Sequence, residues 1–163
     1  MKRIWVLVLV ISCGKAADKP AGSKPEGSAP PPPSGGPPPT KAAVQSGELV
    51  VTGAFAGTFK WKDDLNLTCT WIPGLKRGAT DMTLTDGANT FMALELKTPD
   101  GKQKVTVTSG ALKSASPLEA DSGFTMTGSE DATHMSVTVD TDVASKEGTK
   151  AHVKGAFELA CPP

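Results

Sequence analysis

Apolar side chains recur at every second position in short runs along most of the chain, as at Met92, Leu94 and Leu96. A period of two is typical of a strand with one buried face, and no window of a dozen residues shows the 3.6-residue period of a helix. Turn-forming residues separate the runs about every ten residues. The pattern predicts strands over residues 48–54, 58–62, 66–72, 80–85, 90–98, 103–108, 123–127, 134–140 and 149–161.

Eight or nine short antiparallel strands in one domain predict an all-β fold, an antiparallel β-sandwich, with a small β-barrel as the alternative. Turn residues at 63–64 suggest a hairpin between the second and third strands. That hairpin would place Phe59 opposite Cys69. It would also place Trp61 opposite Leu67.

The aromatic side chains share the inward parity of their strands. Trp61 follows the parity of Phe59, and Trp71 follows that of Leu67 and Cys69. On the last strand, Val153, Phe157, Leu159 and Cys161 share one parity, while His152, Lys154 and Glu158 point to the other side. We therefore expect the aromatics in the core; the alternative is that Trp61 or Trp71 forms an exposed platform for a ligand.

The first thirteen residues form a secretion signal. A basic start at Lys2 and Arg3 precedes an apolar run over residues 4–11, and Ser12 and Cys13 follow it. This order is that of a signal peptide with a short apolar region. The run would span only about half of a bilayer core as a helix, so we do not expect a membrane-spanning segment.

The exit of this signal, Val10 to Cys13, resembles the lipobox of bacterial lipoproteins. The resemblance implies that residues 1–12 are removed and that a diacylglyceryl group is attached to the thiol of Cys13. It therefore implies a cell-envelope protein that is tethered to a membrane by lipid, and several acyl chains hold a protein stably. Gly14 after the cysteine resembles outer-membrane sorting in enteric bacteria, with a periplasmic or surface location. A secretory signal without lipid is the alternative.

Residues 13–46 combine this cysteine with a segment rich in Pro, Gly, Ser and Ala. Residues 16–43 contain no Leu, Ile, Phe or Trp. Such a composition cannot bury enough apolar surface to offset the entropy of ordering, which predicts a disordered linker. Residues 47–163 then form one β domain of ordinary size.

The remaining two cysteines, Cys69 and Cys161, both have inward parity. Exported proteins form disulfides, so we expect these two to be bonded to each other. The alternative is two free thiols at a metal or redox site, but no CxxC motif is present and neither histidine is near them in sequence.

The charge balance of the domain argues against nucleic acid as a partner. Its eleven Lys/Arg and fifteen Asp/Glu give −4, without the basic stripe that nucleic-acid binding requires. No phosphate loop, HExxH motif or dinucleotide motif is present. Residues 121–123, Asp-Ser-Gly, are similar to the nucleophile turn of serine proteases, but the glycines that should flank them are missing. We predict no catalytic residues and no cofactor.

Two sets of polar residues remain to be assigned. His134 and His152 have outward parity, so we expect them at the surface and not as metal ligands. Asp140 and Asp142 match the first two ligand positions of a calcium-binding loop, but the later positions lack the required residues. A different kind of calcium site, which also uses Glu147, is an alternative.

These observations favour a non-catalytic binding or structural module over an enzyme. The loop with Lys76 and Arg77, which follows Pro73-Gly74, and residues 109–122 are the loops that we expect to contact an envelope protein or glycan. An envelope hydrolase and a calcium-stabilised adhesive domain are the two alternatives.

Overall fold

The computed structural model describes residues 38–112 and 115–163. The predicted signal peptide, the predicted lipidation site Cys13 and most of the predicted linker lie outside these residues. None of the helices in the described part of the chain has the length and apolar content required to span a bilayer. Its elements are β1 (Ala43–Gly53), β2 (Gly57–Phe59), β3 (Leu67–Ile72), η1 (Pro73–Leu75), β4 (Arg77–Thr85), β5 (Phe91–Lys97), η2 (Pro99–Gly101), β6 (Lys104–Ser109), β7 (Leu118–Ala120), β8 (Phe124–Gly128), β9 (His134–Ala144) and β10 (Lys150–Ala160).

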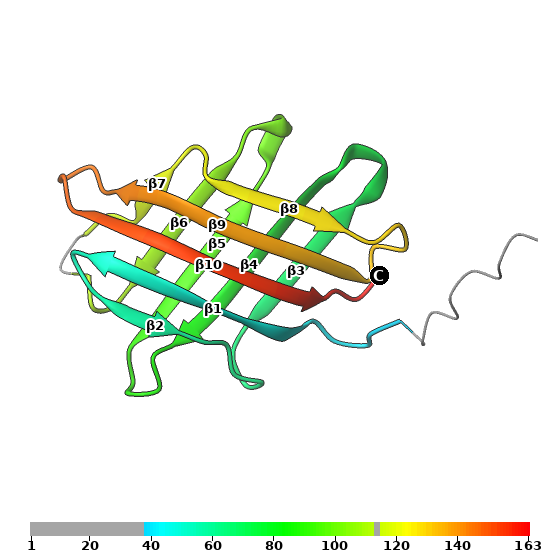
Figure 1. The fold of residues 1–163 in the computed structure, drawn as a ribbon, viewed down its shortest axis with the longest axis horizontal. Coiled ribbons are helices and arrows are strands. Elements are labelled where there is room, and N and C mark those ends of the chain that lie inside the picture. Colours follow the sequence, from blue (N-terminus) through cyan, green and yellow to red (C-terminus); the bar gives the residue numbers. More distant parts are fainter. Residues whose placement is uncertain (1–37, 113–114) are drawn as a thin grey trace, which may run out of the picture. The chain divides into compact units, whose positions relative to one another are not determined.

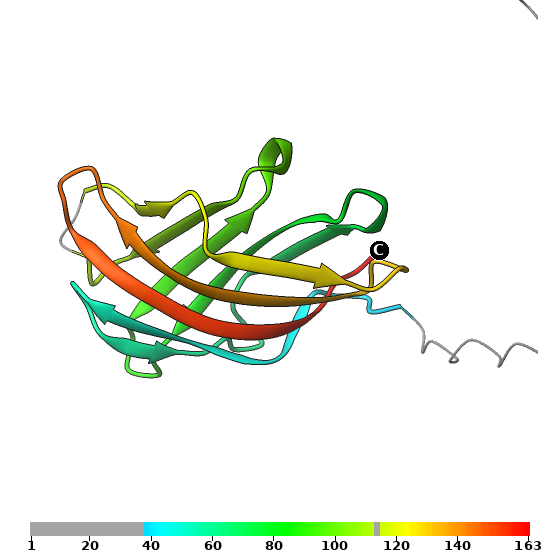
Figure 2. The same ribbon diagram turned by 45° about the horizontal axis from the view of Figure 1, so that its top comes forward.

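The fold is all-β and antiparallel, as predicted, with ten strands in place of eight or nine. All ten belong to one sheet in the order β2-β1-β10-β9-β7-β6-β5-β4-β3, with β8 paired to β9. The sheet folds over into two layers: β2, β1, β10, β9 and β8 form one, and β7 to β3 form the other (Figures 1 and 2). It is a sandwich-like arrangement that is not closed into a barrel, so the barrel alternative is wrong.

Two sparse contacts join the layers at the backbone. On one side, Glu119 of β7 pairs with Ala144 at the end of β9. On the other side, Lys60 and Thr85 exchange two backbone hydrogen bonds of 2.9 Å, which form an isolated bridge next to β2 and at the end of β4. The layers therefore meet at the backbone through short pairings, and side chains make the rest of their contact.

The predicted hairpin between β2 and β3 is wrong. Phe59 of β2 pairs with Leu49 of β1, and β3 pairs with β4. The segment between β2 and β3 instead crosses from one layer to the other, where Asn66 O accepts a hydrogen bond from Thr83 N at 2.9 Å. Turn-forming residues at 63–64 serve this crossing and not a hairpin.

The first strand begins earlier than predicted. Strand β1 begins at Ala43 and not at residue 48, because Ala43 pairs with Ala160 of β10 and Val44 packs against the core. The missed tenth strand is β7, which lies in the segment 109–122 that was predicted as an exposed loop. Leu118 of β7 is fully buried, so this part of the prediction is also wrong.

The core lies between the two layers and follows the predicted parities. Trp71 is buried with 8% of its surface exposed, and Trp61 is half-buried against the core while its indole N–H donates to Leu65 O at 3.2 Å. The tryptophans do not form an exposed platform. The largest fully buried side chains are Phe59, Phe157, Leu49, Met82, Leu84, Met92, Leu94, Leu96, Leu118, Met135, Leu159 and Val51.

Candidate functional site

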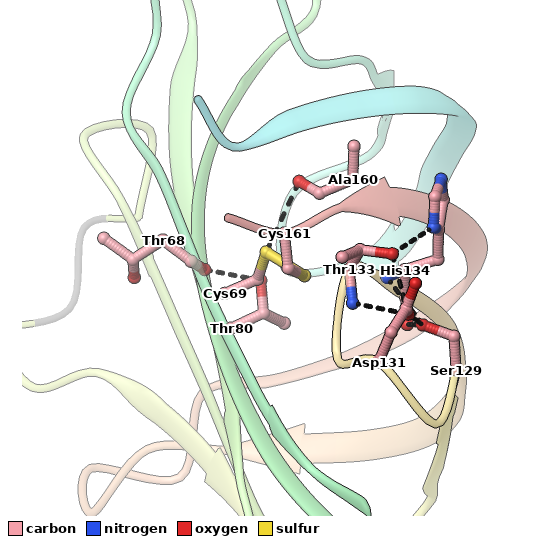
Figure 3. The surroundings of a disulfide bond; sticks show 9 residues. All are labelled: Thr68, Cys69, Thr80, Ser129, Asp131, Thr133, His134, Ala160 and Cys161. Carbon is pink, nitrogen blue, oxygen red and sulfur yellow. Dashed lines mark hydrogen bonds between the residues drawn. A yellow bond between two sulfur atoms is a disulfide. The ribbon is translucent and has the colours of Figure 1, made fainter. Parts of the chain in front are cut away.

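The two cysteines of the domain lie at disulfide distance. Cys69 on β3 and Cys161, just after β10, have their sulfur atoms 2.12 Å apart and their Cα atoms 5.5 Å apart (Figure 3). The bond links the two layers of the sheet at a side where no backbone pairing joins β3 to β10. The predicted pairing agrees with this geometry.

Hydrogen bonds to the side chain of Asp131 hold the turn between β8 and β9 (Figure 3). Asp131 Oδ1 accepts hydrogen bonds from Ser129 Oγ, Thr133 N and Thr133 Oγ1. These bonds lower the pKa of Asp131 from 3.8 to about 2, and the bond from Ser129 has the largest effect. Thr133 O accepts a hydrogen bond from the backbone N–H of Cys161 at 2.8 Å, so this turn supports the disulfide-bonded end of the sheet.

His152 lies between two carboxylates on the outer face of β9 and β10. Its Nδ1 is 2.9 Å from Asp142 Oδ1, and its Nε2 is 3.2 Å from Asp140 Oδ1. Lys154 Nζ lies 2.7 Å from the other oxygen of Asp140, and its hydrogen bond is the largest cause that lowers the pKa of Asp140. His152 also borders a hollow of roughly 400 Å³ that Asp142 and Glu119 line.

This cluster is not arranged for general-base catalysis, because carboxylates already occupy both ring nitrogens of His152. Nor are the three predicted calcium ligands brought together. Asp140 and Asp142 contact His152, whereas Glu147 accepts a hydrogen bond from Ser116. Within residues 38–112 and 115–163, no three His, Cys, Asp or Glu side chains gather closely enough to hold a metal ion.

The predicted contact residues Lys76 and Arg77 lie at the tip of the β3–β4 hairpin. Lys76 follows the single turn η1 and adopts a left-handed conformation with φ +49°, while its N–H donates to Pro73 O at 3.1 Å. Arg77 begins β4, and its guanidinium lies over Gly101 in the β5–β6 turn. A Cβ at residue 101 would lie 2.8 Å from Arg77 Nη2, so a larger residue there would displace the guanidinium.

The hairpin tip forms one wall of a groove, and strand β8 forms the other. A hollow of roughly 390 Å³, the Arg77 hollow, is lined by Leu75 to Gly78, Thr98, Gly101, Gln103 and Phe124 to Met126. A second hollow of roughly 330 Å³, the Trp71 hollow, is lined by Trp71, Pro73, Lys76, Met126 to Gly128 and Glu130. The two share Lys76 and Met126, and together they follow the whole length of β8. We refer to them jointly as the β8 groove.

The charges of the β8 groove are uneven. Lys76 and Arg77 line the Arg77 hollow with no carboxylate among its lining residues, and Glu130 lines the Trp71 hollow. Neither cation has a carboxylate partner within salt-bridge distance among the residues that the structure describes. The groove is thus a cationic site on a domain of net charge −4.

Sequence inspection identified the two cations of this groove but not its other wall. Residues 71–78 and 124–128 are far apart in sequence and come from different layers, so no local pattern joins them. Gln103 was likewise missed; its amide lies just before β6 and bonds the backbone of Gly123 and Phe124, where β8 begins.

No known protein family, curated protein or solved structure matches this chain.

Proposed function

We propose that the chain is a bacterial envelope lipoprotein whose β domain is a non-catalytic module that binds an envelope protein through the β3–β4 hairpin. Lipid on Cys13 holds the protein at a membrane, and the resemblance of Gly14 to outer-membrane sorting favours the outer membrane. The linker lets the domain reach its partner. The single observation that carries the binding role is the composition of the hairpin tip, where exposed apolar and unpaired cationic side chains stand together.

Four residues of the tip support this role. Ile72 exposes 46% of its surface and Leu75 exposes 60%, next to Lys76 and Arg77. Apolar side chains beside an arginine are typical of the centre of protein interfaces, where a partner removes them from water. Because β3 and β4 hold the tip in a fixed hairpin, little conformational entropy is lost on binding.

The backbone at Lys76 supports the same conclusion. A left-handed conformation is common for glycine and asparagine but costs other residues about 1–2 kcal/mol. A lysine at this position therefore lowers the stability of the turn, and residues held in such conformations cluster at functional sites. We predict that Lys76→Asn leaves the fold as stable or slightly more stable while it weakens partner binding.

The anchor is tested by the intact mass of detergent-extracted protein. A species that starts at Cys13 and carries acyl mass supports the lipoprotein assignment. Cys13→Ser should shift the protein from the membrane fraction to the soluble fraction. Unmodified protein that begins elsewhere would contradict this part of the proposal.

The binding role is tested by photo-crosslinking in living cells, with a photoreactive amino acid at position 75. The matched control is position 91, because Phe91 is also apolar and half-exposed (50%) but lies at the other end of β5 from the η2 turn. We expect a discrete adduct at position 75, lost in a Lys76→Glu/Arg77→Glu background, and none at position 91. Equal adducts at both positions, or none at 75, would contradict the proposal.

A further inference from the structure

Strand β8 has an open edge that faces the β8 groove. Among the described residues, β8 pairs with β9 alone. The backbone N–H and C=O of Phe124 point away from β9, because Gln103 Oε1 accepts the N–H at 3.4 Å and Gln103 Nε2 donates to the carbonyl at 2.6 Å. Backbone groups alternate in direction along a strand, so those of Met126 and Gly128 point to the same open side as those of Phe124.

The backbone groups at this open edge differ in whether they have a hydrogen-bond partner. The side chain of Gln103 acts at Phe124 as a short substitute for a neighbouring strand. No side chain and no loop backbone among the described residues bonds to Met126 or Gly128. A neighbouring strand would therefore find free backbone donors and acceptors directly after the position that Gln103 covers.

The opposite wall adds side-chain recognition. Leu75 and Trp71 provide apolar surface, and Lys76 and Arg77 provide two cations without carboxylate partners. The indole Nε1 of Trp71, which lines the Trp71 hollow, is buried without a hydrogen-bond partner in the described structure. A buried donor without a partner is costly, so this wall is unlike an ordinary packed surface.

We propose that the β8 groove binds an extended peptide segment of the partner protein, which adds to β8 as a strand and places an acidic side chain against Lys76 and Arg77. The backbone of Met126 and Gly128 supplies the affinity that is independent of sequence, and the two cations supply the selectivity for acidic peptides. This inference rests on the proposed binding role and names the form of the partner. Charge complementarity selects the occupant, because the Arg77 hollow carries two cations and no anion.

A peptide library provides the test, with the purified full chain in detergent as bait and random dodecamers displayed on phage as the probe. We expect the wild type to enrich peptides with Asp or Glu between β-branched or aromatic residues. Lys76→Glu/Arg77→Glu should weaken the binding of selected peptides at least tenfold, while Lys146→Glu, a charge reversal in the β9–β10 turn, should not. No enrichment, or enrichment that ignores acidic residues, would overturn the proposal.

A proline at position 126 tests strand addition itself. Met126→Pro removes an N–H that faces the groove and not β9, a position where edge strands tolerate proline. Met126→Ala is the matched control, because it shortens the same side chain but keeps the N–H. We expect Met126→Pro to bind selected peptides at least tenfold more weakly than Met126→Ala, and equal binding would overturn strand addition.

Amide hydrogen exchange gives a readout that needs no variant. Bound peptide should slow exchange at Met126 and Gly128 and leave β2, a remote edge strand, unchanged. If these amides are unaffected while crosslinking at position 75 still depends on Lys76 and Arg77, the hairpin contacts its partner by side chains alone. That outcome rejects strand addition and leaves the proposed function in place.

Discussion

The side chain of Gln103 holds the backbone of Phe124 at both polar groups and also accepts the N–H of Gly123 at 2.9 Å. One amide, just before β6, thus fixes the point where the chain leaves β7 in one layer and enters β8 in the other. Because these bonds are half-buried, water replaces them poorly.

Loss of this amide should destabilise the domain. We expect Gln103→Ala to lower the free energy of unfolding by about 1–3 kcal/mol, since it leaves backbone groups of residues 123 and 124 without partners. Urea denaturation followed by tryptophan fluorescence measures the change. Thr108→Ala, an exposed position on β6, the strand that follows Gln103, should stay within about 0.5 kcal/mol of wild type, and an equal effect of both substitutions would refute the role of Gln103.

Gly128 is required by the indole ring of Trp71. A Cβ at residue 128 would lie 2.5 Å from two ring atoms, so Gly128→Ala should cost about 1–3 kcal/mol and shift the tryptophan emission. Gly74→Ala is the control, because a Cβ there meets nothing within 4 Å. Thermal melting of both variants decides the matter: matching melting temperatures would mean that the ring moves aside freely.

The disulfide should be a major source of stability. Cys69 and Cys161 are separated by 92 positions in sequence, and on the loop-entropy account a bond of this span contributes at most about 4–5 kcal/mol. We expect reductant to lower the urea midpoint of the wild type. The Cys69→Ala/Cys161→Ala variant should have a low midpoint that reductant does not change, and a wild-type midpoint insensitive to reductant would show that the bond contributes little.

Acid should weaken the turn that Asp131 organises. The pKa of Asp131 falls to about 2 in the folded chain from an ordinary 3.8, so the folded state favours the charged carboxylate. Its contribution is complete above about pH 4 and is lost as the pH falls toward 2. Asp131→Asn should therefore flatten the pH dependence of unfolding in this window, measured by urea titration at a series of pH values. Asp64→Asn, in an exposed turn, should leave that dependence as steep as in the wild type.

The strands could be predicted because each carries its own alternation. Met92, Leu94 and Leu96 show their buried face without reference to any partner, and all three are buried. β7 was missed because three residues, of which only Leu118 is fully buried, are too few to show a period. The predicted pairing of β2 was wrong because turn residues show that the chain bends but do not show which layer it enters next.

The groove could be predicted only in part. Lys76 and Arg77 were found because a Pro-Gly turn marks an exposed hairpin tip. Whether a cation at such a tip has a carboxylate partner depends on residues from other strands, and the sequence does not show which these are. The open edge of β8 depends on sheet order in the same way, since a strand is an edge only with respect to its neighbours.

The position of the disulfide also determines how the domain carries force. Tension between the proposed membrane anchor and a proposed partner at the β3–β4 hairpin would enter the domain at Ala43, which pairs with Ala160 beside Cys161. From there the bond to Cys69 leads directly into β3, two residues before Trp71 and the hairpin. The load would cross the backbone pairing at these adjacent ends of β1 and β10 and then a covalent bond, so it would bypass most of the core. With the proposed anchor and partner in place, the disulfide therefore lies on the short path between the point where the chain enters the domain and the hairpin that contacts the partner.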